Sequence, residues 1–349
     1  MDGIAIDSAA YARGVRRFRI EATQAAGVPA VRLADPDAAV EVMTGAVVPH
    51  GTDCVIPLEE YDLAGGLVSL KDRASAAAYR NVQRRGEDSE SGVPMLTAGT
   101  RLRAPEIAVV ASAGLALVRV SRQPRIMVIS TGDELIEPGR PIEEHQVRRS
   151  NAYAVVAALR GHGFENVGDD HLLDDEALLG ERLGLHLASA DVLILSGGVS
   201  KGKFDLVPKV LKDLGVREVF YQVAQRPGMP MWFGATPDGR CVFGLPGNPV
   251  STLICLLRYV VPALSRAMGA APAPAERAAL AEPVTIRRPF TYFMPVAVHT
   301  DECARVCARP RAPNGPGDFL ALTDADGFIE LPPNTEPFPE GFSAALYRW

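Results

Sequence analysis

The sequence predicts a multidomain α/β protein whose central region is a doubly wound α/β/α sheet. Three observations lead to this fold class. Between residues 125 and 269, short apolar runs of strand length alternate with helix-length segments, which is typical of a mostly parallel sheet covered on both faces. Residues 1–86 and 274–349 instead hold short β-like pieces and turn residues. With 349 residues, the chain is also too long for one compact domain.

The central elements follow from local patterns. RIMVI (125–129) is an apolar run expected to form a buried strand. Ser150 and Asn151 are suited to cap a helix whose apolar positions share one face, with Gly161 and Gly163 ending it. Pro208 fits the first turn of a later helix. Further strands are expected at 164–170, 191–195, 216–223, 229–234 and 241–245, and further helices at 174–188, 204–215 and 248–269.

The sequence also gives predictions for the segments that join these regions and for the start of the chain. The apolar run IAVVASAGLALV (107–118) is too short to cross a bilayer and predicts a short buried helix that leads into a strand. The Ala/Pro stretch 269–279 is the best linker candidate. The start of the chain has no basic region followed by an apolar core, so we expect no signal peptide.

Composition excludes several classes of function. Hydrophobic residues make up 47% and charged residues 22%, as in ordinary soluble proteins. The formal net charge of −6 argues against general nucleic-acid binding. The five cysteines are odd in number and lack metal-ligand spacing, and the histidines form no metal motif. A reducing cytoplasm is the expected compartment.

Three glycine-rich loops each follow an expected buried strand: STGDEL (130–135), SGGVSKGKFD (196–205) and GLPGNPVS (244–251). In a doubly wound sheet such loops meet at the carboxyl edge, where ligands bind. Glycines let backbone N–H groups approach an oxyanion. Ser200, Lys201 and Lys203 would add donors, and Glu134 and Asp205 would hold a divalent cation that bridges phosphates. The loops therefore predict a phosphorylated ligand, the alternative being that they only join strands to helices.

Two familiar nucleotide motifs do not occur. A phosphate-binding P-loop needs GxxxxGK followed by Ser or Thr, but 198–203 reads GVSKGK, which is one residue short and lacks the hydroxyl. No GxGxxG follows the first strand of the central region, so a dinucleotide site has no support. The anionic ligand is therefore expected to bind through a motif other than a P-loop or a dinucleotide-binding loop.

The motifs MDGIA, MTGAVVPHGTDCV, RRGED, STGDEL, SGGVSKGKFD, RPGMP, GLPGNPVS and DGFIELP, in this order, resemble the molybdopterin molybdenumtransferases (the MoeA and gephyrin E-domain family). The resemblance implies a homodimer whose subunits have a β-rich N-terminal domain (1–86), a remnant of an elongated helical linker domain (87–121), a three-layer α/β/α molybdopterin-binding domain (122–269) and a C-terminal β-barrel-like domain (274–349). It also implies that molybdate is inserted into adenylylated molybdopterin, with magnesium, and that AMP is released.

The resemblance carries the family's functional residues onto this sequence one by one. The implied catalytic residues are Asp2, Thr44, Asp88, Glu134, Asp174 and Asp205, of which Glu134, Asp205 and Asp88 would hold magnesium. Asp174 is preferred over Asp170 and Asp175. The implied pterin- and oxyanion-binding residues are Thr131, Gly132, Ser196, Gly197, Gly198, Ser200, Lys201, Arg226, Pro246, Gly247, Asn248, Ser251 and Arg288. Turn or cap chemistry is the alternative for Asp2, Thr44 and Ser251.

The sequence departs from the family's pattern in three places. The DG motif lies at the start of this chain, and two alternatives stay open: the sequence is trimmed, or the elongated domain is incomplete. The family's lysine-proline-glycine-lysine sequence reads RPGM here, which loses a charge at Met229, and Pro316 replaces a serine of the family's GSG turn. These losses keep two alternatives open: a pterin-binding or scaffold protein of the same fold without efficient turnover, and a dinucleotide phosphohydrolase. The preference between molybdate and tungstate stays open.

Overall fold

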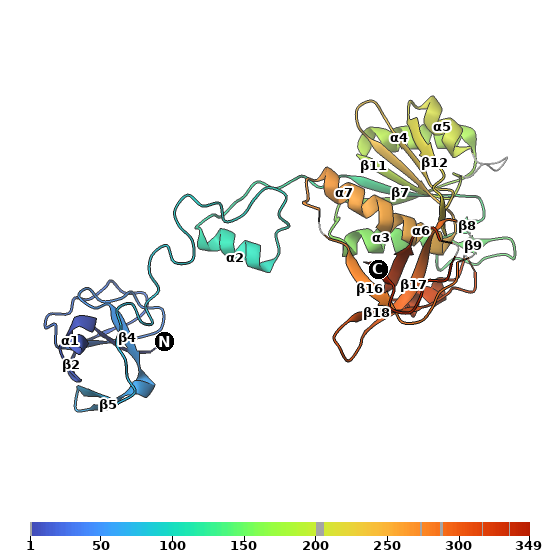
Figure 1. Cartoon of the computed structure of the whole chain (residues 1–349). Coiled ribbons are helices and arrows are strands. Elements are labelled where there is room, and N and C mark those ends of the chain that lie inside the picture. Colours follow the sequence, from blue (N-terminus) through green and yellow to red (C-terminus); the bar gives the residue numbers. More distant parts are fainter. Residues whose placement is uncertain (1, 200–205, 273, 287–288, 316, 335) are drawn as a thin grey trace. The chain divides into compact units, whose positions relative to one another are not determined.

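The computed structural model describes residues 2–349 except 200–205, 273, 287–288, 316 and 335. The chain divides into two compact units, Met1–Met95 and Leu96–Trp349, and each is described by itself (Figure 1). The finer division into four domains stays a prediction.

The first unit is built on a six-stranded sheet in the order β4-β1-β3-β2-β6-β5. Its elements are β1 (Gly3–Ile6), α1 (Ser8–Ala12), β2 (Arg17–Gln24), β3 (Ala39–Val42), β4 (Cys54–Pro57), a 3₁₀ turn (Leu58–Glu60), β5 (Tyr61–Ala64) and β6 (Leu67–Leu70). Gly3 pairs with Pro57, and a Cβ added at Gly3 would lie 2.1 Å from the carbonyl oxygen of Ile56. The glycine of the DG motif is therefore needed for the close approach of β1 and β4.

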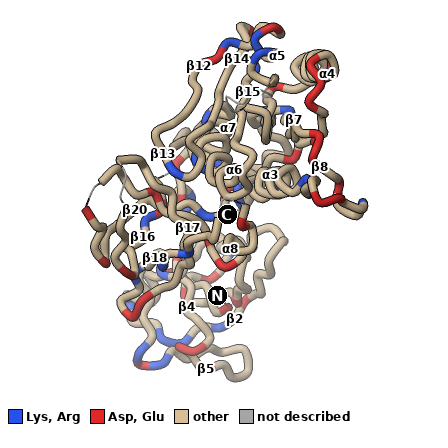
Figure 2. Tube along the Cα trace, turned by 90° about the vertical axis from the view of Figure 1, so that its right-hand side faces the viewer, with Lys and Arg blue, Asp and Glu red and all other residues tan. Residues whose placement is uncertain are grey.

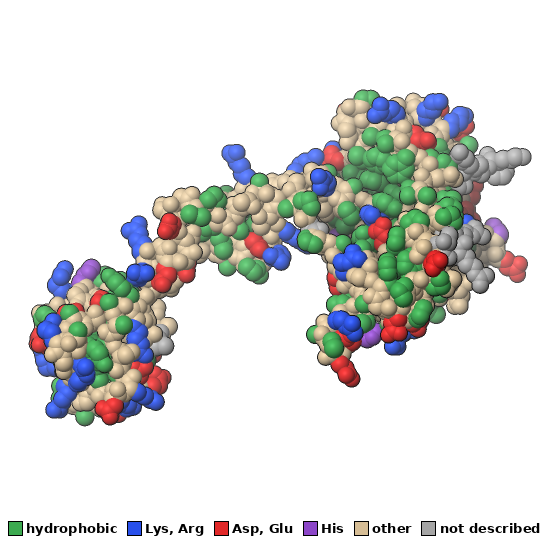
Figure 3. Space-filling view, in the orientation of Figure 1, with side chains coloured by type: hydrophobic (Ala, Val, Ile, Leu, Met, Phe, Trp, Pro, Cys, Tyr) green, Lys and Arg blue, Asp and Glu red, His purple; other side chains and the backbone are tan. Residues whose placement is uncertain are grey.

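The second unit opens with α2 (Ala104–Ser112), which has Pro105 in its first turn. The predicted short helix is therefore present, but its predicted burial is wrong, because none of its residues is buried. Ile107 is 52% exposed and Leu117 is 90% exposed, and Figure 3 shows hydrophobic side chains on the surface of this segment. The expected strand is also missing, since residues 113–125 form turns and irregular structure before β7 begins at Ile126. The residues of the apolar run are all exposed or half-buried.

A second six-stranded sheet forms the centre of this unit, in the order β10-β7-β11-β15-β14-β12. Its strands are β7 (Ile126–Thr131), β10 (Val167–Leu172), β11 (Val192–Ser196), β12 (Arg217–Tyr221), β14 (Trp232–Ala235) and β15 (Cys241–Leu245). β10, β7, β11 and β15 are parallel, while β14 runs antiparallel to both of its neighbours. The predicted mostly parallel sheet is confirmed, with an antiparallel edge.

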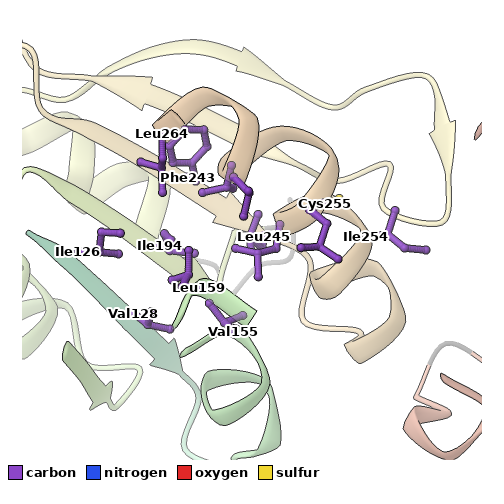
Figure 4. Packing of buried hydrophobic residues seen from close by; sticks show 14 of the residues in the cluster. Ile126, Val128, Val155, Leu159, Ile194, Phe243, Leu245, Ile254, Cys255 and Leu264 are labelled. Atoms are coloured by element: carbon purple, nitrogen blue, oxygen red, sulfur yellow. The ribbon is translucent and has the colours of Figure 1, made fainter. Parts of the chain in front are cut away.

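Helices cover both faces of this sheet, as a doubly wound fold requires. The covering helices are α3 (Ser150–Gly161), α4 (Glu176–Ser189), α5 (Val207–Asp213), α6 (Pro249–Cys255) and α7 (Val261–Ala267). One apolar cluster joins α3, α6 and α7 to the strands, and Figure 4 shows residues such as Leu159 and Leu264 packed near Ile126 and Ile194. A second cluster joins α4 and α5 to the opposite face. Figure 2 shows acidic residues on α4 and basic residues near α5.

The predicted long helix at 248–269 is present but not regular. Between α6 and α7 lies a π-helical turn, η2 (Leu256–Val260), and π turns inside helices are frequent at functional sites. The continuous helix Pro249–Ala267 has the length and apolar composition of a membrane span, with 56% of its window buried inside the molecule. Its buried residues belong to the core cluster around α3, which is the behaviour of a core helix.

The C-terminal strands close into a barrel. The barrel region contains β16 (Glu276–Leu280), β17 (Thr291–Thr300), β18 (Val306–Pro310), β19 (Gly327–Leu331), β20 (Ser343–Arg348) and the short α8 (Phe319–Thr323). The order β17-β18-β16-β20-β19 returns to β17 through a β17–β19 pairing, which closes the ring. The short strand β13 (Gln225–Arg226), which precedes β14 in the chain, also pairs with β17. The predicted β-barrel-like domain is confirmed.

Candidate functional site

The loops that follow β7, β11 and β15 meet at one edge of the parallel sheet. β7 is flanked by β10 on one side and β11 on the other, so the chain changes winding direction between β7 and β11. Ligands of open α/β sheets bind outside the carboxyl ends of the strands at such a switch point. The sequence prediction that STGDEL, SGGVS and LPGNP gather at one edge is consistent with this topology.

A cavity of about 360 Å³ lies at this edge. Its wall comes from the three loops, from the start of α3 and from the barrel region. The lining residues are Ser130, Thr131, Glu134, Leu135, Val147, Arg148, Arg149, Ser150, Asn151, Ser196, Gly197, Gly247, Pro249, Gly317 and Phe319. Its volume falls in the range of small-molecule pockets, and most of its described lining is polar.

Asn151, at the start of α3, joins the loops that follow β11 and β15. Its Nδ2 donates to Ser196 Oγ (2.9 Å), to the Gly247 carbonyl (2.7 Å) and to Thr252 Oγ1 (3.3 Å). A carbonyl oxygen only accepts, so the contact with Gly247 fixes which way round the amide is. Its Oδ1 is buried and has no hydrogen-bond partner among the described residues. The side chain therefore presents a fixed, unused acceptor.

Thr131 presents a second unused polar atom. The residue is 4% exposed, and its Oγ1 has no partner in the described part of the chain. It lies close to the SGGVS loop, where a Cβ added at Gly198 would be 2.5 Å from Thr131 Oγ1. Gly198 has a φ of +64°, which favours glycine for a second reason. Buried polar groups are rarely left unpaired in native proteins, so these two atoms are candidates for contacts with a ligand.

The STGDEL loop is held against the segment after β10. His171 Nε2 lies 2.8 Å from the Gly132 carbonyl, and the Asp174 backbone N–H donates to Asp133 Oδ1 at 3.0 Å. Since a carbonyl accepts, His171 carries its proton on Nε2 in this contact. These contacts fix the loop that carries Glu134, whose carboxylate has no hydrogen-bond partner among the described residues.

An ion cluster centred on the buried Arg149 forms part of the pocket wall. Arg149 is 5% exposed and pairs with both Glu137 and Asp169, while its Nε donates to Ser130 Oγ at 3.3 Å. Hydrogen bonds from Arg149 and then from Tyr153 hold the pKa of Glu137 below its ordinary value. Two carboxylates therefore compensate one guanidinium, so this arginine supplies no net positive charge to a ligand. It supports Ser130, a residue of the wall.

Three family models match consecutive parts of the chain. They are the MoeA N-terminal region (domain I and II) over residues 1–114, the "Probable molybdopterin binding domain" over residues 127–266, and the MoeA C-terminal region (domain IV) over residues 277–349. A molybdopterin molybdenumtransferase of Synechocystis is 38% identical over 350 residues, which cover 100% of this chain and 87% of that protein. The chain belongs to the molybdopterin molybdenumtransferase family.

Other relatives agree with this family. A molybdopterin molybdenumtransferase of Bacillus subtilis is 31% identical, with 97% of this chain and 80% of that protein covered. The crystal structure of a molybdopterin biosynthesis MoeA protein from Pyrococcus horikoshii matches with a TM-score of 0.77 and 28% identity, covering 100% of this chain and 86% of that one. The predicted family and fold class are confirmed, and with them a transferase of molybdenum cofactor biosynthesis.

The pocket of this family member contains part of the predicted residue set. Thr131, Glu134, Ser196, Gly197 and Gly247 line it. Gly132, Gly198, Pro246 and Asn248 belong to the same loops without lining the cavity; the Pro246 and Asn248 carbonyls both accept from Thr252 Oγ1. The functional roles of all these residues stay predictions.

Other predicted residues of the second unit lie away from the cavity lining. Ser251 is 3% exposed within α6, and Arg226 is exposed on β13. The acid chosen before α4, Asp174, lies beside the STGDEL loop, while Asp175 caps α4 and Asp170 pairs with Arg182 and His186. The preference for Asp174 over Asp170 and Asp175 stays a prediction.

In the first unit, Asp2 and Thr44 are in contact. The backbone N–H and the hydroxyl of Thr44 both donate to Asp2 Oδ1, at 2.7 and 2.8 Å. The backbone bond and then the hydroxyl bond lower the pKa of Asp2. Asp88 is exposed and accepts from Gln83 Nε2. Both the catalytic and the turn interpretation of Asp2 and Thr44 fit this geometry.

Four predicted site residues, Ser200, Lys201, Asp205 and Arg288, lie outside the described residues, as do Lys203 and Pro316.

The sequence analysis missed two kinds of pocket residue. It assigned Ser150 and Asn151 to a helix cap, which is wrong: the N-cap of α3 is Arg149, without a side-chain cap bond, and Asn151 turns its amide into the pocket wall. In sequence, an Asn at the start of a helix looks the same whether it caps the helix or contributes to a pocket wall. Phe319 was not considered, because it is distant in sequence from the glycine-rich loops.

Proposed function

We propose that this chain inserts molybdate into adenylylated molybdopterin and releases AMP. Membership of the molybdopterin molybdenumtransferase family supports the reaction class. The observation that carries the proposal is the cavity at the switch point, with two buried polar atoms, Thr131 Oγ1 and Asn151 Oδ1, that lack partners among the described residues. Such atoms cost free energy in the empty protein, and a pterin substrate would satisfy them.

In this proposal the described residues bind and orient the substrate. Asn151 Oδ1 accepts a hydrogen bond from the pterin, and Thr131 Oγ1 bonds to it as donor or acceptor. The contacts of Asn151 with Ser196 and Gly247 hold two loops in one arrangement before the ligand arrives. Pre-organisation of this kind lowers the entropic cost of binding and places the reacting groups.

Magnesium is part of the proposal. No group of three or more His, Cys, Asp or Glu side chains suited to a metal occurs among the described residues. Magnesium usually takes only one or two carboxylates and completes its shell with water and substrate phosphates. The unpartnered Glu134 carboxylate in the pocket wall fits that requirement, and Asp205 is proposed as a further ligand. When bound, the ion would neutralise phosphate charge during cleavage of the phosphoanhydride.

The deciding experiment follows AMP release from adenylylated molybdopterin with and without molybdate. We expect molybdate-dependent release by the parent and its loss in Glu134→Gln, because the amide lacks the charge that a cation needs. Glu143→Gln is the matched control, since Glu143 is a strongly exposed carboxylate outside the cavity lining. Equal turnover in Glu134→Gln and the parent would remove the metal role from Glu134.

The same assay separates the alternatives. The losses at Met229 and Pro316 favour a pterin-binding or scaffold protein, which would bind the pterin without molybdate-dependent AMP release. A dinucleotide phosphohydrolase would release AMP from an ordinary dinucleotide in the absence of molybdate. Either result would contradict the proposed transferase reaction.

We also propose a cytoplasmic homodimer that contacts other cofactor-biosynthesis proteins. All five cysteines are free, which is consistent with a reducing compartment. Light scattering coupled to size-exclusion chromatography would test the dimer, and a monomer at micromolar concentration would contradict it.

A further inference from the structure

The aromatic residue of the described pocket lining, Phe319, comes from the barrel region. All the other described lining residues are polar, aliphatic or glycine. The cavity is therefore shared between the α/β/α sheet, which supplies hydrogen-bonding groups, and the barrel region, which supplies a ring. Both belong to the same compact unit.

Local contacts fix the position of this ring. Phe319 is the first residue of α8, whose cap Asp318 accepts from the Ala321 backbone N–H at 3.0 Å. Asp318 also accepts from the backbone N–H of Asn314 at 3.0 Å, which ties the preceding turn to the cap. Phe319 is half-buried and packs against the apolar cluster that contains α6. A ring held in this way loses little further freedom when a ligand stacks on it.

The polar part of the same cavity selects the kind of group that it accepts. Asn151 Nδ2 is occupied by three acceptors, so only Oδ1 remains, and Oδ1 can only accept. Phosphate and molybdate dianions bring no donor to it. A heterocycle with ring N–H or amino groups does, and it also has a flat face for an aromatic neighbour.

We propose that Phe319 is a specificity-determining residue that stacks on the pterin ring while the N–H edge of the same ring bonds to Asn151 Oδ1. This inference rests on the proposed function of the same site and adds the orientation of the substrate. The heterocycle enters the cavity, and the phosphate and oxyanion groups lie toward the side away from Asn151.

The test measures equilibrium binding of three probes: pterin, followed by its own fluorescence, AMP, and molybdate. Phe319→Leu keeps an apolar side chain but removes the ring, and Phe319→Tyr restores an aromatic face. The matched control is Leu320→Ala, since Leu320 is the next residue of α8, is 77% exposed and does not line the cavity. Should Phe319→Leu not fold, Phe319→Met retains more volume and serves the same comparison.

We expect Phe319→Leu to weaken pterin binding about 3- to 10-fold, as expected from the loss of one aromatic pair. AMP and molybdate binding should stay within about twofold of the parent, Phe319→Tyr should bind pterin like the parent, and Leu320→Ala should change nothing. Unchanged pterin affinity in Phe319→Leu would overturn the inference. So would an equal loss for all three probes, which would mean that Phe319 only shapes the cavity, or a loss confined to AMP, which would put adenine on the ring.

Failure of this inference and failure of the proposed function give different results. A parent that releases AMP with molybdate, together with unchanged pterin affinity in Phe319→Leu, overturns the stacking role alone. A parent that binds pterin through Phe319 but never releases AMP overturns the transferase reaction alone.

Discussion

Replacement of Thr131 by valine should separate stability from ligand binding. Valine has the same branched shape, but it lacks the hydroxyl, whose oxygen is buried without a partner among the described residues. A buried hydroxyl without a hydrogen bond costs roughly 1–3 kcal/mol. Thr131→Val should therefore leave the free energy of unfolding of the ligand-free protein unchanged or raise it by about 1 kcal/mol. For a unit of this size that corresponds to about 2–4 °C in the melting temperature.

The same variant should lose affinity for pterin. If the hydroxyl bonds to the ligand, its removal costs about 1–3 kcal/mol of binding free energy, or about 5- to 100-fold in the dissociation constant. Thr131→Ser is the matched control, because it keeps the hydroxyl and deletes a buried methyl group. It should lose about 1 kcal/mol of stability and retain pterin binding.

Two measurements check this reasoning: urea denaturation of the ligand-free protein, and titration of pterin fluorescence. Thr131→Val should lose affinity for pterin without losing stability, and Thr131→Ser should lose stability without losing affinity. A Thr131→Val protein that is clearly less stable than the parent yet binds pterin equally well would refute the argument, since the hydroxyl would then serve the fold and not the ligand.

Three further predictions concern the second unit. Leu159→Ala should lower the free energy of unfolding by about 2–5 kcal/mol, measured by urea denaturation, because Leu159 is fully buried between α3 and the sheet. Hydrogen bonds from the Arg122 and Arg125 side chains lower the pKa of Asp191 from its ordinary 3.8. The ionised Asp191 therefore stabilises the fold above pH 3.8, and this stabilisation is lost as the pH falls below that value. Asp191→Asn should reduce the loss of stability at acid pH, measured as the free energy of unfolding against pH. Burial raises the pKa of Cys255 to about 12, so a thiol reagent at pH 8 should label the exposed Cys303 and reach Cys255 only after unfolding.

The sheet and its loops were predictable because their signals are local. The parallel strands β7, β11 and β15 are mostly continuous apolar runs, and each ligand loop follows its strand directly, as STGDEL follows 125–129. Burial was predicted wrongly where it depends on contacts with residues far away in the sequence. Run 107–118 is apolar enough for a core, yet none of its residues is buried.

The pocket was predictable only in part for the same reason. Glycine-rich loops are recognisable in the sequence, so Ser196, Gly197 and Gly247 were predicted as binding residues, and they line the cavity. Asn151 has the composition of a helix cap, and only the three-dimensional positions of Gly247 and Ser196 reveal its role. Phe319 reaches the cavity from a different part of the chain, through the packing of α8 against α6, which a linear pattern does not contain.

The pairing of β13 with β17 makes the barrel inseparable from the sequence that precedes it. Gln225 and Arg226 lie between two strands of the central sheet, yet their backbone pairs with Thr291 and Tyr292 of the barrel. A fragment cut in the Ala/Pro linker would leave the start of β17 as an unpaired edge, and such edges promote aggregation. A chimera that exchanges barrels between relatives would likewise have to match the donor's β17 to the recipient's 225–226 segment. An exchange of the barrel in engineering would therefore have to include the 225–226 segment with it.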